Sequence, residues 1–339
     1  MKQVAGIAVD EIELPFKAPF DWQRMLRFYG GRSSAGVETV EDGCYIRTLD
    51  WQGDSGLLRV RRDSHRPCLI AQLEGPASHH LGALEAKLMY MFDLYTDPAQ
   101  VRDGLGGDPW LLRLTSQAPG LRIPGAWSAF ELVVRTIVGQ QVSVKAATTI
   151  TGRLVARAGR PADGPSHECA AWQFPTPAAL AAADLDLIGM PTKRVAALQN
   201  FAQAVADGLP IDAPVIPVAR GRALERFSSQ GDSSDAPQSG GSPLAPESRD
   251  SAALRKALLG LPGIGPWTVE YVAMRAWRDT DAWPGSDLVL MQAIARQHPT
   301  LLKPAQQAVC SEGWRPWRAY AAMHLWNEIA DHAGAQRGG

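Results

Sequence analysis

The stretch LPGIGPWTVEYVAM, Leu261 to Met274, is the part of the sequence that most constrains the fold. Gly263 and Gly265 flank one isoleucine, and Pro266 follows where a helix can begin. Because glycine has no Cβ, this turn can adopt positive φ and can bring backbone N–H groups close to a bulky partner. Those groups lie at a helix N-terminus, which favours an anion such as a DNA phosphate. A plain corner between two helices is the alternative interpretation.

Residues downstream of this turn suggest a pocket. Trp267 and Tyr271 are four residues apart and therefore share one face of the predicted helix. Asp287 lies at the expected start of the next helix, where backbone N–H groups can cap it and keep its carboxylate ionised. An ionised carboxylate beside an aromatic face can stabilise a cation. Most aspartates at such positions are plain N-caps and most tryptophans pack in cores, so these structural interpretations stay open.

Composition fits a soluble globular protein of two or three domains. The chain has 339 residues, of which 45% are hydrophobic and 20% are charged. The net charge is only −1, but the range from Pro109 to Arg160 contains seven basic residues against one acid. A local basic face is what phosphate binding needs, although scattered solvated arginines explain the count equally well.

Targeting and redox signals point to the cytoplasm. The sequence has no apolar run of the roughly 18 residues that a transmembrane helix requires, and acids appear too early for a signal peptide. The cysteines lie far apart, which favours free thiols over a metal cluster. They are Cys44, Cys68, Cys169 and Cys310.

The hydrophobic pattern divides the chain near residue 100. Residues 1–100 predict an α+β domain in which helices cover one small antiparallel sheet, with Asp21 capping the helix DWQRMLRFYGGR. Residues 101–335 predict an all-α domain with almost no strand signal and with a helix-hairpin-helix at about 252–277. Residues 228–250 contain 13 Ser, Gly or Pro in 23 positions and predict a disordered insertion.

Taken together, these features resemble the helix-hairpin-helix base-excision glycosylase superfamily. Within it, the chain is most similar to the 3-methyladenine DNA glycosylase II family of bacterial alkylbase glycosylases. The similar motifs run almost end to end in the same order and include FDWQRMLRF, GLRIPG, VGQQVSV, GMPTKR, LPGIGPWTVEYVAMRAW, WPGSDL and WRPWRAYAAMHLW. The resemblance implies an N-terminal α+β domain and a helical domain of two lobes, with the active site in the cleft between the lobes.

The resemblance also implies roles for individual positions. Asp287 corresponds to the catalytic aspartate of the family. The positions that line the base pocket are Trp267, Tyr271, Trp326 and Phe28. The positions that contact DNA are Gly263, Gly265, Thr268, Gln140 and Gln141.

Two further implications concern the wedge and a cation. Gln141 occupies the position that fills the hole left by the flipped nucleotide, where the best-known member of the family has leucine. Its amide can still fill space and hydrogen-bond to the orphaned base. No cofactor is expected to be required, but a Na⁺ or K⁺ ion at the hairpin is implied on the backbone carbonyls of Leu259, Leu261 and Ile264.

The implied chemistry suits these residues. Extruding a base costs roughly a few kcal/mol, and aromatic stacking returns about 1–3 kcal/mol for any base. Alkylated purines carry a positive charge, which gains about 0.5–2 kcal/mol more over an electron-rich ring. Such a base leaves as a neutral molecule, so one carboxylate can suffice to stabilise the sugar cation.

The expected activity is therefore that of a monofunctional DNA glycosylase. It would release alkylated purines of the 3-methyladenine and 7-methylguanine type from double-stranded DNA and leave an abasic site. Trp267 stands where lyase members carry a lysine. We expect a cytoplasmic monomer that acts on the nucleoid, with no membrane partner.

Other functions are compatible with part of this pattern. A non-catalytic helix-hairpin-helix module that binds DNA would need the glycines but not an aspartate at a pocket. A regulatory helix-turn-helix protein would need a recognition helix rich in Arg, Asn and Gln, and the sequence contains none. Of the eleven tryptophans, we expect Trp127, Trp314 and Trp317 to be structural.

Overall fold

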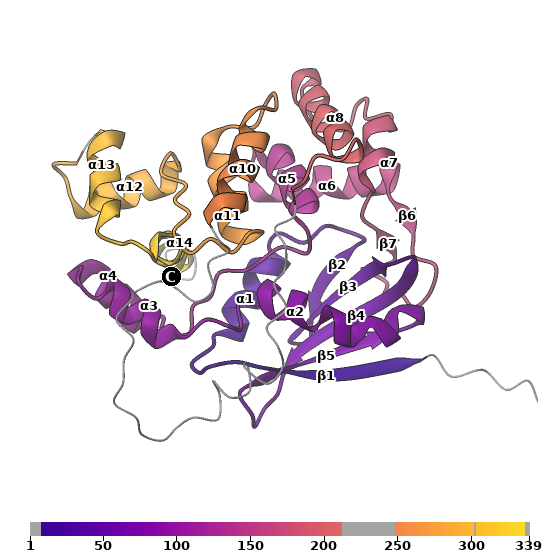
Figure 1. Cartoon of the computed structure of the whole chain (residues 1–339), viewed down its shortest axis with the longest axis horizontal. Coiled ribbons are helices and arrows are strands. Elements are labelled where there is room, and N and C mark those ends of the chain that lie inside the picture. Colours follow the sequence, from indigo (N-terminus) through magenta and orange to yellow (C-terminus); the bar gives the residue numbers. More distant parts are fainter. Residues whose placement is uncertain (1–7, 212–247, 302, 336–339) are drawn as a thin grey trace, which may run out of the picture.

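The computed structural model describes residues 8–211, 248–301 and 303–335. Its N-terminal part is a five-stranded antiparallel sheet of order β1-β5-β4-β3-β2 (Figure 1). In the edge strand β1 only Ile12 and Leu14 alternate with acids, a pattern too short for the sequence to predict the strand. The strands are β1 (Val9–Pro15), β2 (Glu38–Glu41), β3 (Cys44–Trp51), β4 (Asp54–Arg62) and β5 (Cys68–Glu74).

Helices cover this sheet as the sequence predicted. Helix α1 (Trp22–Gly30) begins after Asp21, whose carboxylate accepts a hydrogen bond of 2.9 Å from the backbone N–H of Arg24. The 3₁₀ helix η1 (Pro76–His80) and helix α2 (Leu81–Met91) follow strand β5. These elements and the sheet bury one hydrophobic core that extends from Leu14 to Leu94. The predicted α+β domain is confirmed.

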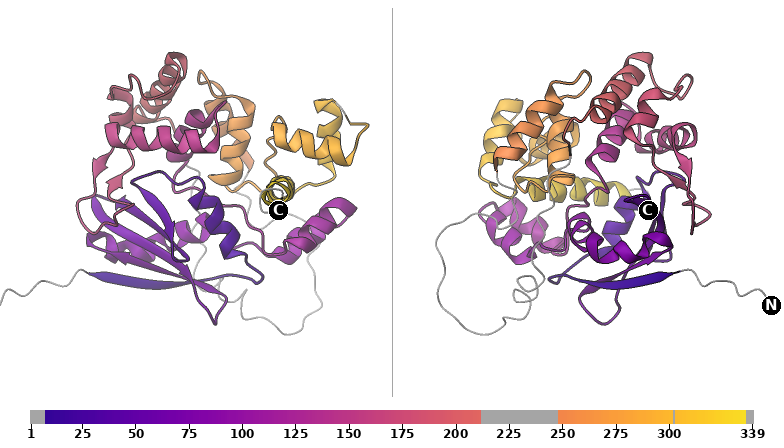
Figure 2. Two further views of the ribbon diagram at one scale, coloured as in Figure 1. Left: turned by 180° about the vertical axis from the view of Figure 1, so that it is seen from behind. Right: turned by 45° about the vertical axis from the view of Figure 1, so that its right-hand side comes forward.

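The helical domain has two lobes, which Figure 2 shows above and beside the sheet. The first lobe contains α3 (Pro98–Leu105), α4 (Pro109–Gln117), α12 (Leu288–Gln297), α13 (Pro304–Glu312) and α14 (Arg318–Ala335). The second lobe contains α5 (Ala129–Gly139), α6 (Val144–Ala158), α7 (Pro177–Ala182), α8 (Thr192–Ala206), α10 (Ser248–Leu259) and α11 (Pro266–Arg275). None of the helices that the structure describes is long and apolar enough to cross a membrane.

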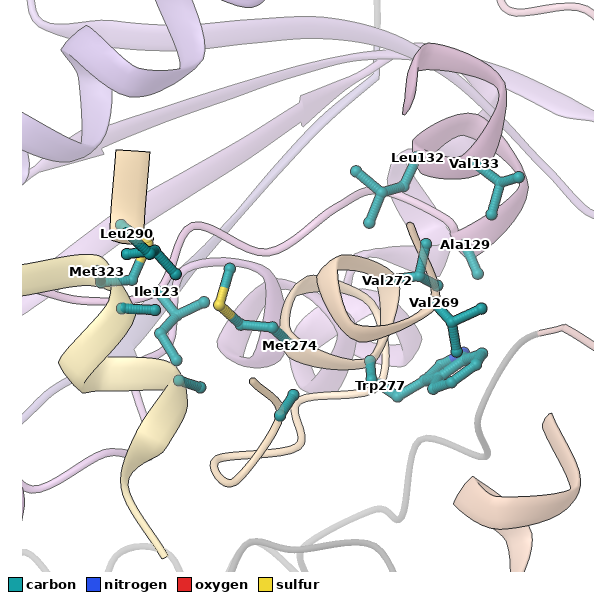
Figure 3. Close-up of a cluster of buried hydrophobic side chains, with 14 of the residues drawn as sticks. Ile123, Ala129, Leu132, Val133, Val269, Val272, Met274, Trp277, Leu290 and Met323 are labelled. Carbon is teal, nitrogen blue, oxygen red and sulfur yellow. The ribbon is translucent and has the colours of Figure 1, made fainter. Parts of the chain in front are cut away.

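Helix α11 joins the two lobes through a shared core. Figure 3 shows Val269 and Val272 of α11 near Leu132 and Val133 of α5, with Met274 toward the other lobe. The predicted helix-hairpin-helix is therefore built as α10, the turn at Gly263 and Gly265, and α11. Residues of both lobes therefore pack in one core with the second helix of this hairpin.

Two local features differ from the expectations. A two-stranded ribbon, β6 (Arg160–Pro161) with β7 (Trp172–Gln173), interrupts the helical domain. The Gln173 side chain bonds the carbonyl of Leu49 at 2.9 Å, which fastens the ribbon to the sheet. Strands of two residues carry no periodic signal. Of the predicted insertion, residues 228–247 lie outside the described residues, while 248–250 form the first turn of α10, so the predicted segment ends too late.

A buried ionic cluster fixes the sheet domain to helix α5. Arg47 of β3 pairs with Glu131 of α5 at 3.1 Å, and Arg135 of α5 pairs with Glu38 of β2 at 2.8 Å. Buried charges cost several kcal/mol each unless they are paired and hydrogen-bonded. Because each of these carboxylates has a guanidinium partner from the other domain, the cluster specifies how the domains dock.

His324 of α14 gives a testable pH dependence. This residue is 3% exposed and lines a cavity with Ala18, Pro19 and Pro98. Burial, helped by the charge of Arg24, lowers the pKa of His324 to about 3. As pH falls below about 6.5, the unfolded chain binds a proton that the folded chain does not. Native His324 should therefore destabilise the fold progressively between these two pH values, by about 1.4 kcal/mol per pH unit.

Urea unfolding of the native protein and His324→Gln at several pH values between 7 and 4 measures this effect. The stability of native protein should fall more steeply with decreasing pH than that of the variant. His65→Gln, which changes an exposed imidazole, is the matched control and should follow the native profile. Parallel profiles for native protein and His324→Gln would contradict the assignment.

Candidate active site

Asp287 is the N-cap of α12, and its carboxylate has more donors than a cap needs. One oxygen, Oδ1, accepts the backbone N–H groups of Val289 and Leu290, both at 3.0 Å. The same oxygen accepts the indole N–H of Trp326 at 3.0 Å, and Oδ2 accepts that of Trp267 at 2.9 Å. Trp267 belongs to the second lobe and Trp326 to the first. The two indoles therefore hold the carboxylate at the junction of the lobes.

Aromatic rings surround this carboxylate. Trp267 stacks on Tyr271 with ring centroids 5.0 Å apart and planes at 11°, as their spacing of four residues predicts. Trp326 meets Tyr271 edge-on, with centroids 6.2 Å apart. All three rings are only partly buried. Trp314 and Trp317, at 2% and 8% exposure, are core residues as expected.

Trp127, the third tryptophan expected to be structural, is only partly buried. It packs on the core of the sheet domain between two cations, with the guanidinium of Arg47 4.4 Å and the ammonium of Lys87 4.7 Å from a ring centroid. Arg47 belongs to the buried ionic cluster between the domains, so Trp127 packs at the domain interface. Trp127 is therefore a packing residue, as expected.

Two arginines at the site are not among the residues that the sequence predicts there. The guanidinium of Arg275 lies 4.7 Å from the ring centroid of Phe28 and 5.2 Å from that of Tyr271. The guanidinium of Arg32 lies 4.2 Å from the same Phe28 ring. Phe28 of α1 therefore reaches the site from the sheet domain. Both Tyr271–Arg275 and Phe28–Arg32 are four-residue steps, which were usable local signals, whereas the approach of the Phe28 pair to Arg275 depends on domain docking.

Arg275 also orients Tyr271. It donates hydrogen bonds to the hydroxyl of Tyr271 at 2.8 Å and to the backbone carbonyls of Pro124 at 2.7 Å and Gly125 at 3.0 Å. Burial raises the pKa of Tyr271, but the nearby charges of Arg275 and Arg32 and the hydrogen bond from Arg275 outweigh burial, so the pKa is lowered overall. The ring is thus held by its hydroxyl as well as by stacking.

The two hairpin glycines serve different purposes. Gly263 has φ of +83°, and a Cβ there would come within 2.7 Å of the Cβ of Ala197. Gly265 is the N-cap of α11, and a Cβ there would meet no atom within 4 Å. Gly263 is therefore required by the turn itself, and Gly265 leaves open space in front of the helix N-terminus. Thr268 is 2% exposed, which argues against the predicted DNA contact through its side chain.

The predicted wedge loop is attached to the hairpin. The side-chain amide of Gln140 donates a hydrogen bond of 3.0 Å to the carbonyl of Gly263. Gln141 is exposed and has φ of +58°, a conformation that non-glycine residues rarely adopt. Its side-chain oxygen accepts a hydrogen bond of 3.3 Å from Arg194. The structure thus places an exposed, conformationally strained glutamine beside the hairpin.

The turn also contains the carbonyls that the resemblance assigned to a monovalent cation. The carbonyl of Leu261 accepts a long hydrogen bond of 3.3 Å from the N–H of Ile264, which leaves a second lone pair for a cation. Leu259 ends α10 on the other side of the turn. Backbone oxygens are suitable ligands for such a hard cation.

A salt-bridge network positions the loop that precedes Asp287. Arg255 of α10 pairs with Glu270 of α11 at 2.8 Å and with Asp279 at 2.6 Å. Glu270 also accepts the backbone N–H of Trp283 at 3.0 Å. The loop from α11 to α12 is therefore tied to both helices of the hairpin, which sets where Asp287 lies relative to Trp267.

Family models match both parts of the chain. A model described as the AlkA N-terminal domain matches residues 11–128, and one described as the HhH-GPD superfamily base excision DNA repair protein matches residues 134–319. DNA-3-methyladenine glycosylase 2 of Escherichia coli is 35% identical over 92% of this chain and 95% of its own length. A probable bifunctional transcriptional activator/DNA repair enzyme AlkA of Mycobacterium tuberculosis is 33% identical over 96% of this chain, which spans 58% of that relative.

Solved structures show the same fold. The 3-methyladenine DNA-glycosylase from Archaeoglobus fulgidus superposes with a TM-score of 0.68 at 18% identity, over 93% of this chain and 96% of that one. An 8-oxoguanine glycosylase/lyase from Clostridium acetobutylicum superposes with a TM-score of 0.63 at 15% identity, over 94% and 97% of the two chains. At these identities the likeness concerns the fold alone.

Proposed function

Because the chain belongs to the helix-hairpin-helix superfamily of base excision DNA repair proteins, we propose that it hydrolyses the N-glycosidic bond of alkylated purines in double-stranded DNA. The observation that carries this proposal is the carboxylate of Asp287, held by two indole N–H groups from different lobes. A structural N-cap needs only backbone donors. Two further donors from aromatic side chains that are only partly buried indicate a carboxylate positioned for use.

In this mechanism the damaged base leaves the helical stack and enters the aromatic pocket. The guanidinium groups over Phe28 and Tyr271 already occupy the region above those rings and repel another cation. We therefore assign recognition of a cationic base to the indoles of Trp267 and Trp326. A cation over such a ring gains about 0.5–2 kcal/mol, which discriminates an alkylated purine from a neutral one.

Asp287 then stabilises the positive charge that develops on the sugar. Preorganised electrostatic stabilisation of this kind is commonly the largest single contribution to catalysis. The cationic base leaves as a neutral molecule, so no second carboxylate is needed to protonate it. Water completes the hydrolysis, and the product is an intact strand with an abasic site.

The DNA contacts assigned to the hairpin form part of the same proposal. Backbone N–H groups at Gly265 and Thr268 face a phosphate at the N-terminus of α11, and Gln141 fills the space of the flipped nucleotide. A Na⁺ or K⁺ ion on the hairpin carbonyls would add positive charge next to that phosphate. We further propose a monomer that acts in the cytoplasm, where the four unpaired cysteines would remain reduced.

Release of free base from methylated duplex DNA tests the proposed activity. Duplex treated with a methylating agent should yield free 3-methyladenine and 7-methylguanine, and untreated duplex should yield far less. The competing function, a non-catalytic DNA-binding module, predicts binding to both duplexes without release. Binding without release would therefore replace the enzyme proposal with the module.

The reaction should stop at the abasic site. A lyase needs an amine that attacks the sugar, and the indole nitrogen of Trp267 cannot do this because its lone pair belongs to the ring. The sequence has no lysine between Lys256 and Lys303. Borohydride added during turnover should trap no protein–DNA adduct, and strands should break only after alkali. A glycosylase/lyase assayed in parallel checks the trapping, and a trapped adduct with this protein would disprove monofunctional chemistry.

A further inference from the structure

Three metal-ligating side chains meet on the sheet domain, on elements that the proposed active site does not use. Asp54 is the first residue of β4, and His79 and His80 are the last two residues of η1. The three ligand atoms all lie within 4.8 Å of one another. The 3₁₀ helix η1 packs on β4. This packing brings Asp54 next to the two histidines, although they are far apart in the sequence.

The distances suit a metal ion better than hydrogen bonding alone. Oδ2 of Asp54 lies 3.0 Å from Nε2 of His80 and 3.5 Å from Nε2 of His79. A hydrogen bond explains the first distance, but the second is at the limit for one. Ligands at the usual zinc distances lie about 3.4 Å apart in a tetrahedron. The two observed distances bracket that value, and the two imidazole nitrogens lie within 4.8 Å of each other, so side-chain movements would let one ion bind all three atoms.

We propose that Asp54, His79 and His80 form a binding site for a divalent transition metal ion of the Zn²⁺ class. Two imidazoles and one carboxylate suit Zn²⁺, Co²⁺ or Ni²⁺, whereas Mg²⁺ and Ca²⁺ prefer oxygen ligands. Three protein ligands leave a fourth position for water. The His79 side chain is 64% exposed and that of His80 is 17% exposed, so the ion can enter from solvent.

The elements that carry these ligands are already ordered. The hairpin before Asp54 turns through Gln52 and Gly53, which have φ of +55° and +93°, as in a tight two-residue turn. The helix that carries the histidines is anchored by Ala77, which is completely buried. The ion would therefore join the β3–β4 hairpin to the start of α2 without refolding either element.

Titration of the full-length protein with Co²⁺ tests this site. Any affinity tag is removed and the protein is first stripped with EDTA. We expect one equivalent of Co²⁺ to bind with the visible spectrum of nitrogen and oxygen ligands, and Zn²⁺ to displace it. His79→Asn is the central variant, because a side chain so exposed is not needed for folding. Both His79→Asn and Asp54→Asn should weaken Co²⁺ binding at least about tenfold, since even the loss of a residue that only supports a metal ligand costs about 10–100-fold in metal affinity.

His167→Asn is the matched control, because His167 pairs with Glu41 at 2.8 Å and has no third ligand beside it among the described residues. It should bind Co²⁺ like the native protein, and so should Cys169→Ser, which removes an exposed thiol. Asp287→Asn should also bind normally, so the site is tested independently of the glycosylase activity. Absence of stoichiometric binding, or binding that His79→Asn leaves unchanged, would overturn the proposal.

Discussion

Asp287→Asn is expected to lower the single-turnover rate of base release by at least about 10²–10³-fold, the usual effect of removing one preorganised electrostatic group. The amide is neutral and offers one acceptor atom and one donor group. It therefore cannot accept both indole N–H groups as the carboxylate does. Asparagine is itself a good N-cap, so the thermal stability and the affinity for DNA should change little.

Asp108→Asn is a close control for this variant. Asp108 caps α4, accepts the backbone N–H groups of Trp110 and Leu111, and accepts the indole N–H of Trp314 at 2.8 Å. Trp314 is a core residue, so this aspartate is a similar N-cap with one indole donor instead of two and without the pocket. Its variant should excise bases at the native rate. Equal losses in the two variants, or undiminished turnover by Asp287→Asn, would remove the catalytic assignment.

Gly263→Ala and Gly265→Ala should separate folding of the hairpin from its contact with DNA. Alanine at the positive φ of Gly263 costs about 1–2 kcal/mol, and crowding against Ala197 costs about 1–3 kcal/mol more. This variant should melt at a lower temperature. Alanine at Gly265 meets no atom within 4 Å, so its stability should be native while its affinity for DNA falls.

The expected loss of affinity for Gly265→Ala is at least about tenfold. One hydrogen bond to a charged group contributes about 1.5–3 kcal/mol, and 1.4 kcal/mol corresponds to about tenfold in Kd. Gly107→Ala is the control, because a Cβ there is equally unobstructed and the residue lies between α3 and α4, away from the hairpin. Native affinity in the Gly265 variant would show that no phosphate approaches this turn.

The sequence predicts those parts of the site that depend on local spacing. Four residues separate Trp267 from Tyr271, and the rings stack as a helix requires. Asp287 caps a helix because the chain before it is a turn and the chain after it is apolar. Trp326 lies on another lobe, and only its resemblance to a family position placed it beside Asp287.

Other parts depend on how the domains dock and carry no local signal. Phe28 reaches Arg275 because α1 of the sheet domain packs beside the hairpin lobe. Burial of Thr268 follows from the helical face that α11 turns toward the core. The bond from Gln140 to Gly263 joins segments that are far apart in sequence. Such features require coordinates, since each is decided by tertiary packing rather than by the pattern of one segment.

If Asp287 stabilises a positive charge on the sugar, native protein should prefer a charged mimic of that sugar to a neutral one. Affinity should be measured for two duplexes, one with a cationic pyrrolidine at the abasic position and one with a neutral tetrahydrofuran there. Because an enzyme binds the transition state better than the ground state, the native protein should bind the pyrrolidine duplex at least about tenfold more tightly, and Asp287→Asn should lose that preference. Equal affinity of the native protein for both duplexes would show that Asp287 does not stabilise a cationic sugar.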